Sequence, residues 1–333
     1  MTRALERNWY RRYGWSLLLA PLSLLYAGVI SVRRLAYRQG WLRSTRVAVP
    51  VLVVGNITVG GSGKTPLTAY IARELGRRGL HVGIISRGYG GRSEHYPLHV
   101  TGDSDATVVG DEPLLLAQRG AATVVVDPVR ARGAQWLVEY HGVDVIVADD
   151  GLQHYALARD AEIAVVDGGR GYGNGWLLPA GPLREPQSRL RTVDLQLVQA
   201  ANGDFTLLPD AVRPLSVDAE TGQGRDLDTF AGQSVHAIAA IGAPARFFAL
   251  LRAHGIDVIE HAFADHHAFS ADDILFADQH PVLMTEKDAV KCRAWADHRH
   301  YYVPVNAHFK AASEQRLHAM LERLATPIRI SRG

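Results

Sequence analysis

The sequence contains a single cysteine, Cys292, which excludes an internal disulfide and fits a reducing compartment. The Cys-x-x-Cys and His-Glu-x-x-His spacings of zinc sites are missing too. No Ser-His-Asp or Cys-His arrangement indicates nucleophilic catalysis, and no repeat or low-complexity tract occurs. These absences leave a globular chain of 333 residues, long enough for two domains.

Acidic residues are scarce in the first 46 positions, which contain nine arginines and one acid, Glu6. This segment therefore carries +8, and because the whole chain carries +2, the remainder carries −6. A basic N-terminus on an acidic body favours anionic lipid as its partner and argues against nucleic acid. Residues 15–32 contain no charge and are bracketed by Arg11-Arg12 and Arg33-Arg34.

This uncharged run lies at the short limit for crossing a bilayer, and Pro21 and three serines weaken a spanning helix. The basic flanks on both sides give no single orientation. We expect residues 1–46 to form a membrane anchor that lies in one leaflet or spans once, and the alternative is an amphipathic helix buried against the domain. Its candidate interfacial aromatic residues are Trp9, Tyr10, Tyr13, Trp15, Tyr26, Tyr37 and Trp41.

A glycine-rich loop follows the apolar run 47–54 and reads Gly-Asn-Ile-Thr-Val-Gly-Gly-Ser-Gly-Lys-Thr-Pro over residues 55–66. A strand, such a turn and a helix that opens with Lys-Thr predict a phosphate-binding loop (P-loop) for a nucleoside triphosphate. Lys64 can reach the β- and γ-phosphates, and the Thr65 hydroxyl can bind Mg²⁺. The general pattern has glycine where this chain has Thr58. The predicted ATP-binding residues are Thr58, Val59, Gly60, Gly61, Ser62, Gly63, Lys64 and Thr65.

Apolar strands alternate with helices beyond the anchor, which predicts an α/β fold with parallel sheets covered on both faces. The first set of strands is expected at 47–54, 81–86, 123–127, 143–148, 162–167 and 195–198, with helices at 64–78 and 129–141. A second set of strands is expected at 235–241, 257–260, 282–285 and 301–304, with helices at 246–254, 271–279 and 311–324. The predicted organisation is an anchor over 1–46, a P-loop catalytic domain over 47–200, a linker over 201–232 and a smaller α/β domain over 233–326.

Carboxylates follow strand ends, where ligands of α/β proteins bind. Asp149 and Asp150 end the run 143–148, and in a P-loop protein such residues hold Mg²⁺ or its water shell. Asp111 and Glu112 form a second acidic pair, which could supply a metal ligand and a general base, although Asp-Glu-Pro is also a common helix start.

Basic and aromatic side chains near the same strand ends are candidates for binding a phosphate or a sugar. They are Arg87 and Tyr89 in Ser-Arg-Gly-Tyr-Gly, Arg130 after the strand 123–127, and Arg184 in an irregular loop. His266 and His267 follow Asp265, ahead of the helix start at Ser270, and suggest acid–base work, metal binding or a plain solvated loop.

Taken together, these motifs resemble one family, the tetraacyldisaccharide 4′-kinases of lipid A biosynthesis. Their order along the chain carries the resemblance, which extends from the anchor to beyond residue 291. Thr58 fits this family's own version of the loop. Besides the P-loop, the motifs are Ser-Arg-Gly-Tyr-Gly, Gly-Asp-Glu-Pro, Asp-Asp-Gly-Leu-Gln-His, Leu-Pro-Ala-Gly-Pro-Leu-Arg-Glu, Asp-His-His and Thr-Glu-Lys-Asp-Ala-Val-Lys.

The resemblance implies two α/β/α sandwich domains with a cleft between them. It implies ATP- and Mg²⁺-dependent phosphorylation of the 4′-hydroxyl of a lipid A disaccharide 1-phosphate, at the cytoplasmic face of the inner membrane of a Gram-negative bacterium. Asp111 matches the family's base and is partnered by a histidine of Asp-His-His, which we place at His266 rather than His267. Glu112, Asp149 and Asp150 would serve the metal, and Arg87, Tyr89, Arg130 and Arg184 would meet substrate or the transferred phosphate.

Two other functions fit the P-loop and the acids alone. A membrane-attached ATPase or switch protein would share them, although the guanine-specific Asn-Lys-x-Asp is missing and Thr-Glu-Lys-Asp at 285–288 is only a distant likeness. A nucleotide-binding regulator without catalysis is the other. Lipid-independent ATP hydrolysis distinguishes a switch from a lipid kinase.

Overall fold

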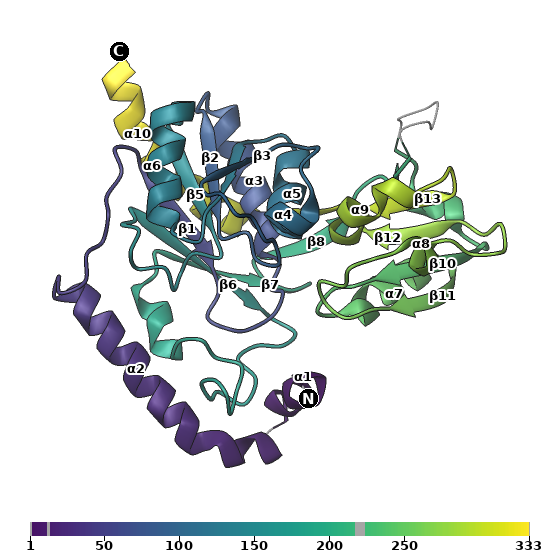
Figure 1. Ribbon diagram of the computed structural model, residues 1–333, viewed down its shortest axis with the longest axis horizontal. Helices are drawn as coiled ribbons and strands as arrows, with labels where there is room; N and C mark the ends of the chain where they lie inside the picture. Colours follow the sequence, from purple (N-terminus) through teal and green to yellow (C-terminus); the bar gives the residue numbers. More distant parts are fainter. Residues whose placement is uncertain (1, 12–13, 217–223, 333) are drawn as a thin grey trace.

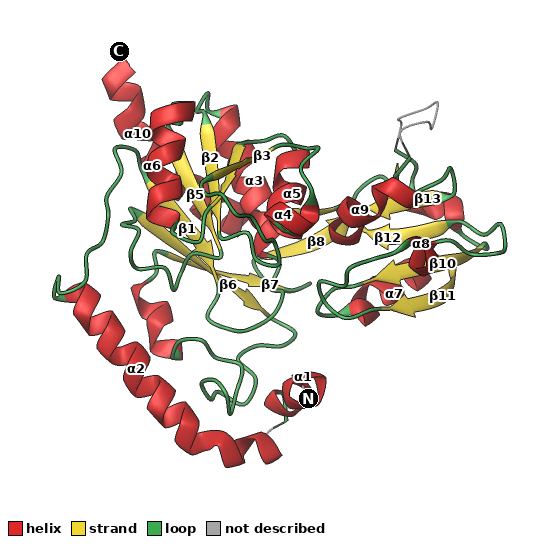
Figure 2. Ribbon diagram, in the orientation of Figure 1, coloured by secondary structure: helices red, strands yellow, loops and turns green. Residues whose placement is uncertain are grey.

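The computed structural model describes residues 2–11, 14–216 and 224–332. Tyr13 of the predicted anchors and residues 217–223 of the predicted linker lie outside them. Figure 1 shows two sheets side by side along the long axis of the molecule, and Figure 2 shows helices packed around each.

The larger sheet has the order β14-β8-β7-β6-β1-β5-β2-β4-β3 among the described residues. Its strands are β1 (Val51–Gly55), β2 (Val82–Ser86), β3 (Leu98–Val100), β4 (Thr123–Val126), β5 (Val145–Asp149), β6 (Ala161–Asp167), β7 (Leu195–Gln199), β8 (Phe205–Pro209) and β14 (Val305–Phe309). The smaller sheet has the order β11-β10-β12-β13-β9. Its strands are β9 (Arg213–Pro214), β10 (Ser234–Ala239), β11 (Asp257–Ala262), β12 (Val282–Thr285) and β13 (His300–Val303).

The inner strands of both sheets are parallel, as the apolar runs predict, and the exceptions lie at the edges. β3 pairs antiparallel with β4, β14 with β8, and β9 with β13. The helices are α1 (Thr2–Trp9), α2 (Ala20–Arg38), α3 (Lys64–Arg77), α4 (Ala106–Val109), α5 (Asp111–Gln118), α6 (Arg130–His141), α7 (Pro244–Ala253), α8 (Ala271–Ile274), α9 (Glu286–Cys292) and α10 (Ala311–Arg332). Four 3₁₀ turns, η1 to η4, cover Trp15–Leu19, Gln187–Thr192, Leu227–Phe230 and Arg293–Trp295.

The strand period of two divides the core of the first domain into two layers. Leu52 and Val54 of β1 pack with α3, α5 and α10, whereas Val51 and Val53 pack with α6 on the other face. The smaller sheet is covered in the same way, by α7 on one face and by α8 and α9 on the other. Cys292 is a buried residue of this second core. The predicted pair of α/β/α sandwiches is therefore confirmed.

The predicted boundaries of the linker and the second domain differ from the structure. Residues 205–209, placed in the linker, form β8 of the larger sheet, and the Phe205 ring stacks on Phe309 of β14. β14 and α10, placed in the second domain, return to the first, where Leu317 and Leu321 are fully buried. The helix predicted over 271–279 ends at Ile274. The chain thus crosses between domains twice, and the two crossings touch, because Asp210 N–H donates to the Pro304 carbonyl at 2.9 Å.

The N-terminal helices lie outside both sheets, along one side of the first domain (Figure 1). Trp15–Arg38 forms one helical stretch long and apolar enough to cross a membrane, with a mean hydropathy of 1.8, and only 11% of its apolar window is buried. Three of the aromatic residues expected at the membrane face the protein instead. Trp9 donates to the Pro179 carbonyl, Tyr26 donates to the Arg184 carbonyl, and the Tyr37 ring lies tilted against that of Tyr155.

Candidate active site

The P-loop connects β1 to α3 as the sequence predicts, with Lys64 as the first residue of the helix. Gly60 and Gly63 have φ of +101° and +81°, which other residues adopt at a cost. No side chain caps the helix N-terminus, so its N–H groups are available for a phosphate. Thr58 needs no glycine, because it pairs in an antiparallel bridge with Leu183 and is not among the positive-φ residues.

Asn56 braces the loop from inside and was given no role by the sequence analysis. Its side-chain amide is completely buried and donates toward Thr58 Oγ1, the Gly60 carbonyl and Ser62 Oγ at 3.2–3.4 Å. The backbone carbonyl of Asn56 accepts from Gln153 Nε2 at 3.0 Å. The signal was its place in the loop motif, where a polar residue directly follows a buried strand.

Asp149 and Asp150 lie beside the P-loop, in different electrostatic environments. Asp149 is buried and accepts from the Thr68 hydroxyl at 2.9 Å. Burial, together with the charges of Glu112 and Asp150, raises the pKa of Asp149 to about 7. Burial opposes ionisation of Asp150 too, but Lys64 at 3.6 Å and Arg184 at 2.9 Å outweigh it and hold its pKa well below the usual range.

The four candidate substrate residues occupy different positions. Arg184 pairs with Asp150, whereas Arg87 and Tyr89 are exposed on the loop after β2. The Tyr89 ring lies edge-on to the His266 ring, with 5.1 Å between centroids. Arg130 is buried, and its guanidinium donates to the carbonyls of Asp149 and Asp150 at 2.7 and 2.8 Å.

Asp111 and His266 come together from the two domains, as the sequence predicts. His266 Nδ1 lies 3.1 Å from Asp111 Oδ2, and Lys291 Nζ lies 3.4 Å from the same oxygen. Burial would raise the pKa of Asp111, but the hydrogen bond from His266 and the charges of Lys291 and Lys287 outweigh it and lower the pKa. Asp111 is therefore a carboxylate at neutral pH.

The neighbouring histidine points elsewhere. His267 Nε2 lies 3.3 Å from Asp273 Oδ2, in the capping box that starts α8. His266 has a φ of +59°, an uncommon backbone conformation that turns its ring away from its neighbour's direction. The structure thus selects His266 over His267 as the partner of Asp111.

Two lysines of α9 complete the contact between the domains and were not selected from the sequence. Lys287 Nζ lies 3.3 Å from Glu112, 3.4 Å from Asp265 and 3.4 Å from His266 Nε2. Lys291, one helical turn later, reaches Asp111. The signal was present in Thr-Glu-Lys-Asp-Ala-Val-Lys, because lysines four residues apart share one face of a helix.

Ion pairs on both sides of this contact tie the domains together. Arg246 of α7 makes two hydrogen bonds, at 2.9 and 3.0 Å, to the buried carboxylate of Asp167 at the end of β6. Arg119, the residue directly after α5, pairs with Glu286 at the start of α9. The arrangement holds the second domain over the P-loop.

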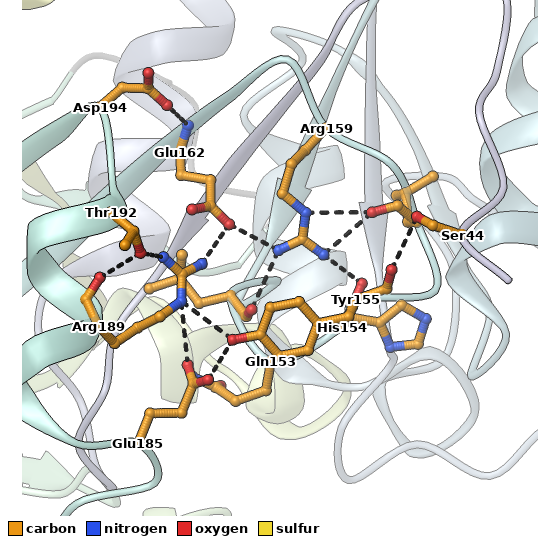
Figure 3. A network of polar contacts seen from close by, with 12 residues as sticks. Ser44, Gln153, His154, Tyr155, Arg159, Glu162, Glu185, Arg189, Thr192 and Asp194 are labelled. Atoms are coloured by element: carbon orange, nitrogen blue, oxygen red, sulfur yellow. Dashed lines mark hydrogen bonds and ion pairs between the residues drawn. The ribbon is translucent and has the colours of Figure 1, made fainter. Parts of the chain in front are cut away.

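A buried charge network supports the loop that carries Arg184 (Figure 3). Glu185 accepts from Gln153 Nε2 at 3.1 Å and from the Tyr155 hydroxyl. Arg189 lies against Glu162, Glu185 and the Tyr155 hydroxyl. Because Gln153 also donates to the Asn56 carbonyl, the network extends to the P-loop.

The residues present fit a magnesium nucleotide. Among the described residues no group of three or more His, Cys, Asp or Glu side chains could hold a metal alone. Mg²⁺ does not need such a cage, because it is usually bound by one or two carboxylates, phosphate oxygens and waters. The buried Oδ1 of Asp150, which lies 3.6 Å from Lys64 Nζ and has no hydrogen-bond partner, is an oxygen of this kind.

Fold and site together define the class of protein, a P-loop kinase with a second α/β domain over its nucleotide loop. The family model described as "Tetraacyldisaccharide-1-P 4'-kinase" matches residues 15–324. The chain is 51% identical to the tetraacyldisaccharide 4′-kinase of Alkalilimnicola ehrlichii over 314 residues, 92% of each chain. It is 47% identical to that of Methylobacillus flagellatus, over 97% of each chain.

A solved structure agrees with this assignment. The crystal structure described as "apo" form LpxK from Aquifex aeolicus in complex with ATP matches 92% of this chain and 99% of its own, with a TM-score of 0.76 and 28% identity. The chain belongs to the tetraacyldisaccharide-1-phosphate 4′-kinase family, as its motifs predict. It is a phosphotransferase, and the ATPase or switch alternative is not favoured.

Proposed function

We propose that this chain transfers the γ-phosphoryl group of ATP to the 4′-hydroxyl of tetraacyldisaccharide 1-phosphate. The observation that carries the proposal is the Asp111–His266 contact of 3.1 Å, which joins the second domain to the helix facing the P-loop. Phosphoryl transfer requires positioning and charge neutralisation more than covalent chemistry. A site that combines a nucleotide loop, a carboxylate and cationic side chains supplies both.

Asp111 is the base in this proposal, and His266 is its positioning partner. Because its pKa is lowered, Asp111 is ionised and ready to accept a proton, but it is a weak base. It therefore takes the proton late, once bonding to phosphorus has made the sugar hydroxyl acidic. His266 and Lys291 hold the carboxylate oriented and keep it charged until that point.

Lys64 and Arg184 neutralise the charge that is transferred, and Thr65, Glu112, Asp149 and Asp150 are the residues that would hold Mg²⁺ or its waters. When bound, Mg²⁺ would draw charge from the phosphate oxygens. We keep Arg87 and Tyr89 as substrate candidates. Both are exposed on the loop after β2, where the Tyr89 ring contacts that of His266. For Arg130 we favour a positioning role, because its guanidinium is occupied by the carbonyls of the acidic pair.

The proposed site of action is the cytoplasmic face of the inner membrane, where α2 lies in one leaflet. The outer face of the helical stretch Trp15–Arg38 carries Leu18, Leu22, Leu25, Val29 and Val32, all more than half exposed. Basic residues flank this face and suit an anionic lipid surface. The substrate carries acyl chains and stays in the bilayer, so an anchored enzyme meets it there.

The experiment that tests the function is transfer of labelled γ-phosphate from ATP to tetraacyldisaccharide 1-phosphate in mixed micelles. Lys64→Ala and Asp111→Ala should lose the labelled lipid, whereas Lys310→Ala, at an exposed lysine directly after the edge strand β14, should retain it. ATP hydrolysis at full rate without lipid, together with no labelled lipid, would contradict the proposal and favour the ATPase or switch alternative.

A further inference from the structure

One face of α2 is polar and is bound to the protein. Ser23, which is 2% exposed, donates from its hydroxyl to the Leu177 carbonyl at 2.8 Å and accepts from Ala180 N–H at 2.9 Å. One turn later, the Tyr26 hydroxyl donates to the Arg184 carbonyl at 3.0 Å. Residues three apart share a helix face, so both hydroxyls hold the same loop, residues 177–184.

The opposite edge of that loop is bound to the P-loop. Arg184 N–H donates to the Ile57 carbonyl at 2.7 Å, and Val59 N–H donates to the Pro182 carbonyl at 2.9 Å. Thr58 and Leu183 form the antiparallel bridge between them. A single strip of backbone therefore separates the two α2 hydroxyls from the phosphate-binding loop.

The same strip carries a charged group of the site. The Arg184 guanidinium lies 2.9 Å from Asp150, whose other oxygen faces Lys64 at 3.6 Å. The Arg184 backbone is thus fixed on one side by Ile57 and on the other by Tyr26. A shift of the strip would move the arginine and the P-loop together.

The lipid-facing residues of α2 are separate from these contacts. Leu25 and Val32 are 67% and 65% exposed and lie on the side of α2 opposite Ser23, two and nine residues further along the helix. Ser31 is exposed on the same helix. The two faces can therefore be changed independently.

We propose that α2 positions the phosphoryl-transfer site in addition to anchoring the protein, and that Ser23 and Tyr26 are its positioning residues. They fix residues 177–184 against the P-loop and so set the place of Arg184 relative to Asp150. The proposal rests on the proposed function for its kinetic part. It makes the seating of a membrane helix a determinant of kcat rather than of lipid access alone.

The test compares hydroxyl deletions with lipid-face deletions. Tyr26→Phe and Ser23→Ala should bind phosphatidylethanolamine–phosphatidylglycerol vesicles like the unchanged chain. Their kcat at saturating ATP and lipid should fall about 3- to 10-fold each, the range expected for one lost hydrogen bond, with KM for lipid unchanged. Ser31→Ala should change neither quantity. Leu25→Ala/Val32→Ala should weaken vesicle binding and raise KM for lipid, with kcat unchanged.

Hydrogen exchange gives a readout that does not depend on activity. Peptides covering 55–63 and 177–185 should exchange faster in Tyr26→Phe than in Ser31→Ala, because the backbone bonds of Val59 and Arg184 open more often. Unchanged kcat and unchanged exchange in both hydroxyl variants would overturn the proposal. If the unchanged chain phosphorylates no lipid, the proposed function fails, and the exchange measurement still decides the positioning claim.

Discussion

The two domains have the same architecture and opposite contributions to the site. Both are parallel sheets covered on two faces by helices. The first supplies the P-loop and the acids Asp111, Glu112, Asp149 and Asp150, whereas the second supplies His266, Lys287 and Lys291. At Asp111 the acid comes from the first domain, and its partners His266 and Lys291 come from the second.

Because the site residues are divided in this way, the contact between the two domains is a point at which the reaction can be controlled. A P-loop with bound nucleotide risks hydrolysis by water, and a site completed only when two domains meet limits that waste. The second domain has no nucleotide loop of its own among its described residues, and its His266 lies against Asp111 of the first.

The largest effect is expected at Asp111, which contacts both His266 and Lys291. Asp111→Asn keeps the shape but removes the carboxylate that we propose as base, so kcat should fall by about 10²–10⁴-fold. The affinity for ATP, measured by equilibrium binding, should change little, because the residue lies outside the P-loop. A kcat within tenfold of the unchanged chain would contradict its assignment as base.

A smaller effect is expected where the domains are tied by Arg246 and Asp167. Arg246→Ala leaves the buried Asp167 carboxylate without two hydrogen bonds, so the free energy of unfolding in urea should fall by about 1–3 kcal/mol. Arg252→Ala on the same helix is the control. It breaks an exposed pair with Glu260 and should cost less than about 1 kcal/mol. Equal losses would show that the interdomain pair is not special.

The smallest effect concerns pH and the stability that Asp111 provides. Its pKa is lower in the folded protein than the unfolded value of about 3.9. Its contribution is therefore fully present above about pH 4 and is lost as pH falls through the lowered folded pKa. The difference in free energy of unfolding between the unchanged chain and Asp111→Asn should shrink over that range. Asp103→Asn, at an exposed aspartate, is the control. The difference in free energy of unfolding between it and the unchanged chain should not depend on the contacts of Asp111.

The local elements could be predicted from sequence, because their signals are local. β1, the P-loop and α3 follow from an apolar run, glycines and Lys-Thr, and Asp149–Asp150 from a strand end. The return of β14 and α10 to the first domain could not be predicted, because pairing of β8 with residues about a hundred positions away has no local signature.

The site shows the same limit. Adjacent histidines look alike in sequence, and only the positive φ of His266 and the contact of His267 with Asp273 separate them. Trp9, Tyr26 and Tyr37 were assigned to the membrane because aromatic residues flank an apolar run, yet their partners are Pro179, Arg184 and Tyr155, far along the chain.

The measurement that tests the central claim most directly is kcat for lipid phosphorylation in the matched variants His266→Ala and His267→Ala. The account predicts a loss of about 10²-fold or more for His266→Ala, with ATP affinity retained, and a change within about threefold for His267→Ala. Equal losses in the two variants, or a larger loss at His267, would contradict the claim that the second domain completes the site through His266.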